Sequence, residues 1–320
     1  MKRVVVTRAL FPEHIARLTP LFDVQDNQAD VPLDAGMLAA RLQDADGAIV
    51  TGGERIDQGA IANAKRLRVV ASVSVGYNHI DVKACEAKGI IVTNTPDVLN
   101  DTTADFGFAL MMAAARRITE SEHWMRAGHW TRWELGQMAG ADIHGSTLGI
   151  LGMGRIGQAV ARRALGFDMT VLYHNRRPVP AKVEEETRAQ WVSFNELLER
   201  SDHLIIVLPY TPAVHHLIGE RELALMKSTA TLTNIARGGI IDEPALVRAL
   251  KSKRLAAAGL DVYEGEPAVL PELLMLDSVA LTPHIASASI PTRKAMGDLA
   301  IDNLIAVLQG DEPLTPITSG

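Results

Sequence analysis

The chain has 320 residues, a formal net charge of −6 and 47% hydrophobic residues. This length and apolar content suffice for two domains, and the acidic balance gives no reason to expect a nucleic-acid partner. The single cysteine, Cys85, excludes an internal disulfide and a cysteine metal cluster, so we predict no bound metal. No apolar run is long enough to span a bilayer and no signal peptide is recognisable, so we expect a cytoplasmic protein without a membrane partner.

Short apolar segments alternate with helix-like segments over the first hundred residues. We predict strands at residues 4–6, 22–24, 48–50, 69–73 and 90–92, and helices at 33–42 and 82–88. Strands that are buried on both faces and alternate with helices form a parallel α/β sheet. This part of the chain is therefore expected to form one α/β domain.

A long apolar periodicity from about residue 103 to 128 predicts one helix that crosses between two domains. Further strands are predicted at 147–151, 169–173, 203–208, 230–235, 257–262 and 279–282, and a last helix at 290–309. Because that helix follows the second sheet, we expect it to return to the first domain. The predicted fold is α/β with two doubly wound parallel-sheet domains. Residues 1–99 plus 285–320 would form a flavodoxin-like substrate domain, residues 100–284 a Rossmann dinucleotide-binding domain, with a cleft between them.

A glycine-rich turn follows the strand at 147–151 and opens a helix-like segment. Gly152, Gly154 and Gly157 have the spacing in which the first glycine permits the turn, the second admits a pyrophosphate and the third lets helix and strand pack closely. Arg155 and Ile156 lie inside this turn and are expected to contact the cofactor as well. The pattern indicates a dinucleotide-binding site.

The end of the next strand distinguishes the two nicotinamide cofactors, because an acidic residue there binds a ribose 2′-hydroxyl and repels a 2′-phosphate. Residues 174–178 contain no Asp or Glu, and Asn175, Arg176 and Arg177 lie there instead. Guanidinium groups form charged hydrogen bonds with phosphate. We therefore predict NADPH as the cofactor, with NADH bound more weakly. The alternative is that the two arginines are solvated loop charges.

Three side chains suited to the reduction of a 2-oxo acid follow the later strands. The reaction needs a cation for the carboxylate and ketone, a proton donor, and an acid that orients the donor. Arg237, Glu266 and His284 are the candidates, and a histidine beside a carboxylate is a tunable proton donor. Each has an ordinary structural explanation when taken singly. Their common placement at strand ends of one sheet is what indicates a catalytic site.

Several segments together resemble the D-isomer-specific 2-hydroxyacid dehydrogenases over nearly the whole chain. They are residues 74–81, 148–157, 234–239, 259–262, the Glu266–Pro267 pair and 283–285. Within that family the sequence is most similar to the glyoxylate/hydroxypyruvate reductases and the 2-ketogluconate reductases, which also carry arginines after the second strand.

The resemblance implies roles for these candidates. Arg237 would hold the substrate carboxylate and carbonyl, His284 would donate the proton, and Glu266 would pair with His284. The backbone amides of Val75 and Gly76 would bind the carboxylate from the other domain.

Further cofactor contacts follow from the same resemblance. Asp261 would lie near the nicotinamide carboxamide, and Thr103 near the nicotinamide or its ribose. Pro209, Ile235 and Ala236 complete the predicted cofactor-binding residues.

The family's proteins are usually dimers, so a homodimer is expected. Trp124 lies near the end of the expected long helix, and Trp130 and Trp133 follow it, in a region where relatives place aromatic residues near the partner's active site. Simple packing at the dimer interface is the favoured explanation for at least two of them.

The expected function is NADPH-dependent reduction of a small 2-oxo acid to a D-2-hydroxy acid. Glyoxylate, hydroxypyruvate and 2-ketogluconate are the candidate substrates. Two alternatives stay open. NAD-dependent oxidation of a D-2-hydroxy acid is disfavoured by Arg176 and Arg177, and a nucleotide-sensing protein similar to the family's co-repressors would share the site residues.

Overall fold

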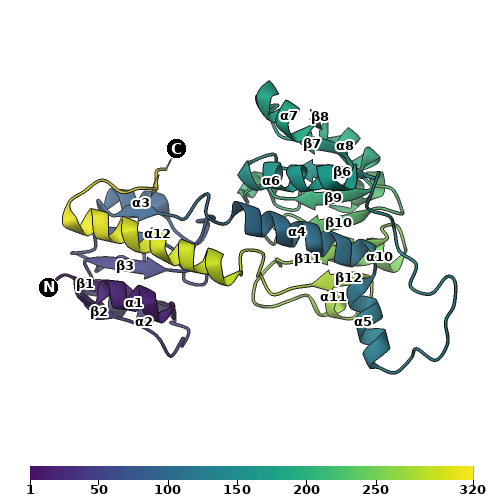
Figure 1. Cartoon of the computed structure of the whole chain (residues 1–320). Helices are drawn as coiled ribbons and strands as arrows, with labels where there is room; N and C mark the ends of the chain where they lie inside the picture. The colour runs from purple at the N-terminus through teal and green to yellow at the C-terminus, as the bar shows by residue number, and fades with distance from the viewer. Residues whose placement is uncertain (320) are drawn as a thin grey trace. The chain divides into compact units, whose positions relative to one another are not determined.

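The computed structural model describes residues 1–319, and the chain divides into two compact units. Unit 1 consists of Met1–Leu99 together with the chain from Ala288 onward, and unit 2 consists of Asn100–Ser287. Both are α/β units built on sheets of mainly parallel strands (Figure 1). Within residues 1–319, no helix has the length and apolar character needed to cross a membrane.

Unit 1 has a six-stranded sheet in the order β13-β5-β4-β3-β1-β2. Its strands are β1 (Arg3–Val6), β2 (Asp23–Gln25), β3 (Gly47–Val50), β4 (Val69–Ser72), β5 (Ile91–Thr93) and β13 (Pro316–Ile317), and its helices are α1 (Pro12–Leu18), α2 (Ala35–Gln43), α3 (Val82–Ala87) and α12 (Ile290–Gln309). The first five strands are parallel and have the order 2-1-3-4-5 of flavodoxin-like sheets. The short β13 adds an antiparallel edge that the sequence pattern did not predict.

The last helix, α12, packs on the sheet of unit 1, and its bounds match the predicted 290–309. Ser289 caps its first turn by accepting the Thr292 N–H, and Gly310 ends it with a φ of 99°. The helix lies close to β3, where a Cβ on Gly47 would come within 3.2 Å of Leu304. Burial of the apolar face of α12 thus fixes the C-terminal segment to the first sheet.

Unit 2 has a seven-stranded parallel sheet in the order β12-β11-β10-β9-β6-β7-β8. Its strands are β6 (Thr147–Leu151), β7 (Thr170–His174), β8 (Ala189–Trp191), β9 (His203–Ile206), β10 (Thr231–Asn234), β11 (Ala257–Leu260) and β12 (Val279–Leu281). Its helices are α4 (Asn100–Ala115), α5 (Ile118–Arg126), α6 (Arg155–Ala164), α7 (Ala181–Thr187), α8 (Phe194–Arg200), α9 (Glu220–Leu225), α10 (Glu243–Lys251) and α11 (Pro271–Leu274), with 3₁₀ turns η1 (Leu165–Phe167) and η2 (Pro212–Val214). The order is that of a Rossmann sheet, and the strand order reverses between β6 and β9, where such sheets bind dinucleotides.

The prediction of a single helix over residues 103–128 is wrong. The structure has two helices, α4 and α5, separated at Arg117, whose φ of 54° cannot continue a right-handed helix. The carbonyl oxygen of Ala115 accepts the N–H of Ala141, and Gly140 lies so close that a Cβ would be 2.4 Å from that oxygen. A distant segment therefore ends α4. Both helices belong to unit 2, so neither crosses to unit 1.

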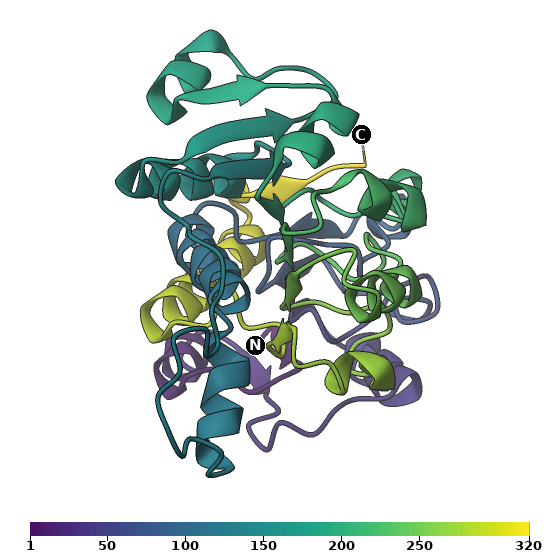
Figure 2. The same ribbon diagram turned by 90° about the vertical axis from the view of Figure 1, so that its right-hand side faces the viewer.

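The two helices have different surroundings. Helix α4 lies against β10 and β11 (Figure 1), and Gly259 of β11 permits the approach because its Cβ would be 2.9 Å from Leu110. Helix α5 has no buried residue, and it extends away from the sheet with the loop that follows it (Figures 1 and 2). Trp130 and Trp133 in that loop are exposed. Their packing against a second subunit stays a prediction.

Candidate active site

The glycine turn between β6 and α6 has the geometry of a phosphate cradle. Gly152 has a φ of 108°, and a Cβ there would lie 2.8 Å from the Leu208 nitrogen. A Cβ on Gly157 would lie 2.2 Å from the Gly152 carbonyl oxygen, so only glycine permits this approach of helix to strand. At Gly154, by contrast, a Cβ would meet nothing within 4 Å. The middle glycine therefore faces open space at the N-terminus of α6, which begins with Arg155 and the half-buried Ile156.

The loop after β7 is attached to this cradle through Asn175. Its Oδ1 accepts the N–H of Met153 at 2.8 Å, and its carbonyl oxygen accepts the Trp191 Nε1–H at 3.1 Å. Arg176 and Arg177 are exposed and form no ion pair in the part of the chain that the structure describes. Sequence reasoning missed the bracing role of Asn175, which leaves only its amide NH₂ for a ligand. The N–H donors of the Arg176 and Arg177 guanidinium groups are available for a ligand.

Other predicted cofactor residues surround the same edge of the sheet. Thr103 on α4 is buried, and its Oγ1 has no hydrogen-bond partner among residues 1–319. Ile235 and Ala236 are buried directly after β10, and Pro209 is exposed in the loop after β9. The unpaired hydroxyl of Thr103 and the open space at Gly154 are both consistent with a dinucleotide-binding site.

Arg237 lies in the loop after β10. Its Nη1 donates to the Ala236 carbonyl oxygen at 2.6 Å, and the Asn234 side chain donates to the Arg237 carbonyl oxygen at 2.9 Å. Burial lowers the pKa of Arg237, and the charge of Glu266 acts in the opposite direction. This guanidinium forms no ion pair among the described residues, so it can accept an anionic ligand.

The loops after β10 and β11 touch at Gly238, where a Cβ would be 1.8 Å from the Tyr263 carbonyl oxygen. No residue with a side chain fits at this position. The close approach places Arg237 beside the loop that carries Glu266, which explains the electrostatic influence of one on the other.

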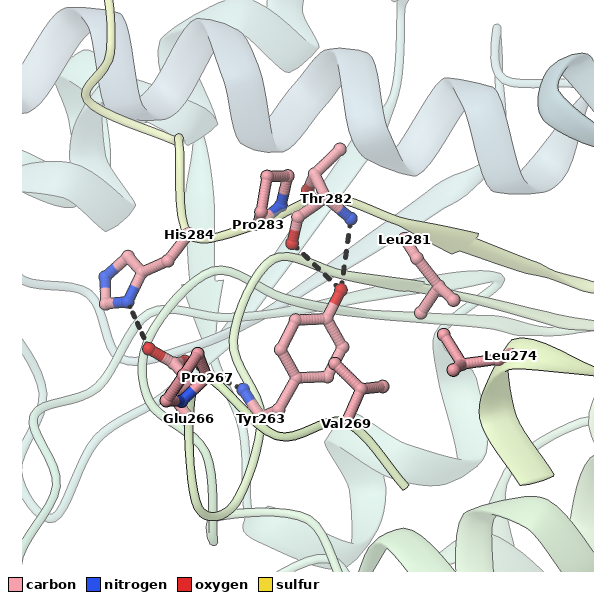
Figure 3. Close-up of a pocket in the computed structure, with 9 residues that line it drawn as sticks. All are labelled: Tyr263, Glu266, Pro267, Val269, Leu274, Leu281, Thr282, Pro283 and His284. Atoms are coloured by element: carbon pink, nitrogen blue, oxygen red, sulfur yellow. Dashed lines mark hydrogen bonds and ion pairs between the residues drawn. The ribbon is translucent and has the colours of Figure 1, made fainter. Parts of the chain in front are cut away.

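Glu266 and His284 are in direct contact (Figure 3). His284 Nδ1 lies 2.7 Å from Glu266 Oε2, while Glu266 Oε1 accepts the Tyr263 N–H at 2.9 Å. Burial raises the pKa of Glu266, but the hydrogen bonds from His284 and Tyr263 and the nearby charges of His284 and Arg237 outweigh it. The pKa of this carboxyl therefore lies below its usual range. With Nδ1–H donating to the carboxylate, Nε2 of His284 is left for a substrate.

The backbone of His284 has a φ of 53°, which is unusual for a residue with a side chain. Asp261, fully buried at the end of β11, holds this segment in place. Its carboxylate accepts hydrogen bonds from Thr282 Oγ1, Ile285 N–H and Ala286 N–H at 2.7 to 2.9 Å, and its carbonyl oxygen accepts the His284 N–H. The pKa of Asp261 lies above its usual range, because burial raises it by more than these three hydrogen bonds lower it. The observed contacts make Asp261 a positioning residue for His284, a role that sequence reasoning did not predict.

A cavity of about 300 Å³ lies beside the pair. Figure 3 shows its lining: Tyr263, Glu266, Pro267, Val269, Leu274, Leu281, Thr282, Pro283 and His284. The Tyr263 hydroxyl donates to the Thr282 carbonyl oxygen at 2.8 Å and accepts the Thr282 N–H. This contact ties the β11 loop to the β12 loop, so the two halves of the His284–Glu266 pair are held by the same framework.

The segment of unit 1 that contains Val75 and Gly76 is also braced by polar contacts. Ser74 Oγ donates to the Gly76 carbonyl oxygen at 2.8 Å and lies 2.7 Å from Ser72 Oγ. Asn94 Nδ2 donates to the Val75 carbonyl oxygen at 2.9 Å. These bonds fix the backbone that carries the two amides predicted to bind a carboxylate.

Asn94 is held in turn by the C-terminal segment. Thr315 Oγ1 donates to the Asn94 carbonyl oxygen at 2.6 Å, and the buried Asn303 on α12 bonds to both the hydroxyl and the N–H of Thr315. A chain of side chains from α12 through Thr315 to Asn94 therefore supports the Val75 segment.

Comparison with known proteins agrees with this geometry. The family model described as "D-isomer specific 2-hydroxyacid dehydrogenase, NAD binding domain" matches residues 108–286. The chain belongs to this family. It is 44% identical over 317 residues to a glyoxylate reductase of Thermococcus gammatolerans, covering 98% of this chain and 95% of that protein.

Solved structures of similar proteins share the fold over nearly the whole chain. One is a D-isomer specific 2-hydroxyacid dehydrogenase from Polaromonas, described as putative, with a TM-score of 0.93 and 38% identity over 99% of this chain and all of that one. Another is the NADPH-dependent glyoxylate/hydroxypyruvate reductase of Sinorhizobium meliloti in complex with NADP and malonate, with a TM-score of 0.88 and 35% identity over 99% and 96% of the chains. The predicted family and fold class are thus confirmed: this 2-hydroxyacid dehydrogenase is an oxidoreductase with a Rossmann-type NAD-binding domain.

Proposed function

We propose that this dehydrogenase reduces a small 2-oxo acid to the D-2-hydroxy acid with NADPH as the preferred cofactor. The observation that carries the proposal is the 2.7 Å contact between His284 and Glu266 at the carboxyl ends of β12 and β11 in a Rossmann sheet. Arg237 lies in the neighbouring loop after β10. The relatives named glyoxylate reductase and glyoxylate/hydroxypyruvate reductase support glyoxylate and hydroxypyruvate as substrates. 2-Ketogluconate is the third candidate.

The residues of this chain have separate tasks in the proposed reaction. Arg237 binds the substrate carboxylate and polarises the ketone oxygen, and the Val75 and Gly76 amides are further donors to the carboxylate. When bound, the reduced nicotinamide supplies the hydride that adds to C2. His284 Nε2 donates a proton to the ketone oxygen as that hydride adds, and Glu266 stabilises the protonated imidazole.

Two parts of unit 2 would hold the cofactor. The pyrophosphate is proposed to lie over Gly154 at the N-terminus of α6, where no Cβ blocks it. Arg176 and Arg177 would bind the 2′-phosphate, since they are exposed and without carboxylate partners in the described chain. The structure of the Sinorhizobium relative with NADP supports this choice.

The test is a screen of NADPH oxidation with glyoxylate, hydroxypyruvate, 2-ketogluconate and pyruvate, repeated with NADH. We expect turnover with at least one of the first three and a preference for NADPH. His284→Ala should lower kcat by about 10² to 10⁴-fold while NADPH still binds. Turnover close to that of the wild type in this variant would remove His284 from the mechanism, and a wild-type preference for NADH would refute the cofactor assignment.

A further inference from the structure

Two adjacent histidines and a glutamate form a cluster that the proposed reaction does not use. His215 and His216 lie in the loop after β9, and Glu264 lies in the loop after β11. His216 Nε2 is 2.8 Å from one carboxylate oxygen of Glu264, and His215 Nε2 is 3.9 Å from the other. We propose that these three side chains bind a divalent transition metal ion of the zinc type, in contrast to the metal-free protein expected from the single cysteine.

The ligand set suits such an ion. Two neutral imidazoles and one carboxylate are common zinc ligands, and they leave a fourth position for water. The ligand atoms of the three side chains all lie within 4.8 Å of one another, and Zn–N and Zn–O bonds of about 2.0 to 2.2 Å require only a modest contraction. The imidazole rings of His215 and His216 are stacked, with 3.9 Å between their centroids and 21° between their planes. Each ring must therefore rotate before the Nε2 lone pairs can point at one ion. Both rings are exposed, which permits that rotation.

The surroundings orient these ligands. His215 Nδ1 lies 3.2 Å from the Tyr210 hydroxyl, and when Nδ1–H donates to it the Nε2 lone pair is left for a metal. The His216 N–H donates to the Gly239 carbonyl oxygen at 2.7 Å. The Glu264 N–H donates to the buried Glu243 carboxylate at 2.6 Å. Because the backbone of each ligand segment is fixed, little order has to be imposed when the ion binds.

Binding at this cluster would link two separate loops. The loop after β9 carries both histidines, and the loop after β11 carries Glu264 two residues before Glu266. A ligand that binds only the folded state stabilises it. Zinc should therefore raise the melting temperature of the protein, whatever substrate the enzyme reduces.

The experiment uses chelator-treated, buffer-exchanged protein. Zn²⁺ is titrated in competition with a chromogenic chelator, and melting curves are recorded with and without the ion. We expect one bound equivalent and a higher melting temperature. His215→Ala and Glu264→Gln should each weaken binding at least tenfold, since loss of an outer contact already costs about 10 to 100-fold in other sites. Tyr210→Phe should have a smaller effect in the same direction.

Two controls separate this cluster from other histidines. His123→Ala removes an exposed imidazole that also lies 3.9 Å from a glutamate, Glu122, but has no third ligand among residues 1–319, so zinc binding should be retained. His284→Ala removes the histidine–carboxylate pair of the proposed active site and should also leave zinc binding intact. The proposal is wrong if wild-type protein binds no zinc, if both His215→Ala and Glu264→Gln bind it as wild type does, or if only His284→Ala abolishes binding. Melting curves without metal confirm that each variant is folded.

Discussion

Glu266→Gln tests whether the carboxylate beside His284 supports proton donation. The substitution preserves the shape of the side chain and removes its charge. Glu266 has a pKa below its usual value of 4.5, so it is ionised throughout the neutral range in the wild type. It lies 2.7 Å from His284 Nδ1, where its charge stabilises the ring that donates the proton. Loss of the charge should therefore lower kcat/KM for reduction at neutral pH.

The size of the effect follows from the exposure of the pair. A hydrogen bond between charged groups contributes about 1.5 to 3 kcal/mol. The side chains of His284 and Glu266 are 46% and 31% exposed, so solvent screening reduces the contribution to roughly 1 to 1.5 kcal/mol. Since about 1.4 kcal/mol corresponds to a factor of ten, we expect kcat/KM to fall by about five- to tenfold.

The assay is the initial rate of NADPH oxidation at subsaturating 2-oxo acid, measured at neutral pH for the wild type and the variant. Glu264→Gln, assayed with a chelator present, is the matched control, because this carboxylate lies in the same loop but contacts His216. It should leave kcat/KM within about twofold of the wild type. An unchanged kcat/KM in Glu266→Gln, or an equal loss in Glu264→Gln, would refute the assigned role of Glu266.

Three further outcomes are expected. Arg237→Lys should lower kcat/KM by at least tenfold because lysine lacks the planar fork that binds a carboxylate; kinetics like the wild type would show that a point charge is sufficient. Arg176→Ala combined with Arg177→Ala should raise the KM for NADPH by roughly ten- to several-hundred-fold and leave NADH kinetics almost unchanged. In the wild type, the preference for NADPH should weaken at high salt. Equal losses with both cofactors would mean that the arginines support the structure of the loop. Thr315→Val should raise the KM for the 2-oxo acid by roughly fivefold with little change in kcat, because the hydroxyl that holds Asn94 is lost; a fall in kcat alone would contradict this.

Some features of this protein could be predicted because their causes are local in the sequence. The parallel strands are short apolar runs, and the last helix has its cap at Ser289 and its terminating glycine at Gly310, so residues 290–309 could be assigned from neighbours in the chain. The glycine turn is equally local, because Gly152 has a φ of 108° and a Cβ on Gly157 would collide with the Gly152 carbonyl oxygen. The family resemblance also rests on short segments, among them residues 148–157 of the glycine turn and residues 283–285.

Other features depend on partners that are far away in the chain. The end of α4 was missed because the bond that caps it comes from Ala141, and the apolar periodicity continues past Arg117. The bracing role of Asn175 depends on Trp191, and the strained backbone of His284 is held by Asp261.

The catalytic pair shows the same division. The residue types of Glu266 and His284 and their places after two strands could be read from the sequence. Their 2.7 Å contact across 18 positions, and the lowered pKa of Glu266, exist only after β11 and β12 have paired and the loops have met. Local pattern determines which elements form and which groups they carry, whereas distance, burial and charge between separate loops are set by tertiary packing, because they depend on every neighbour brought to the site.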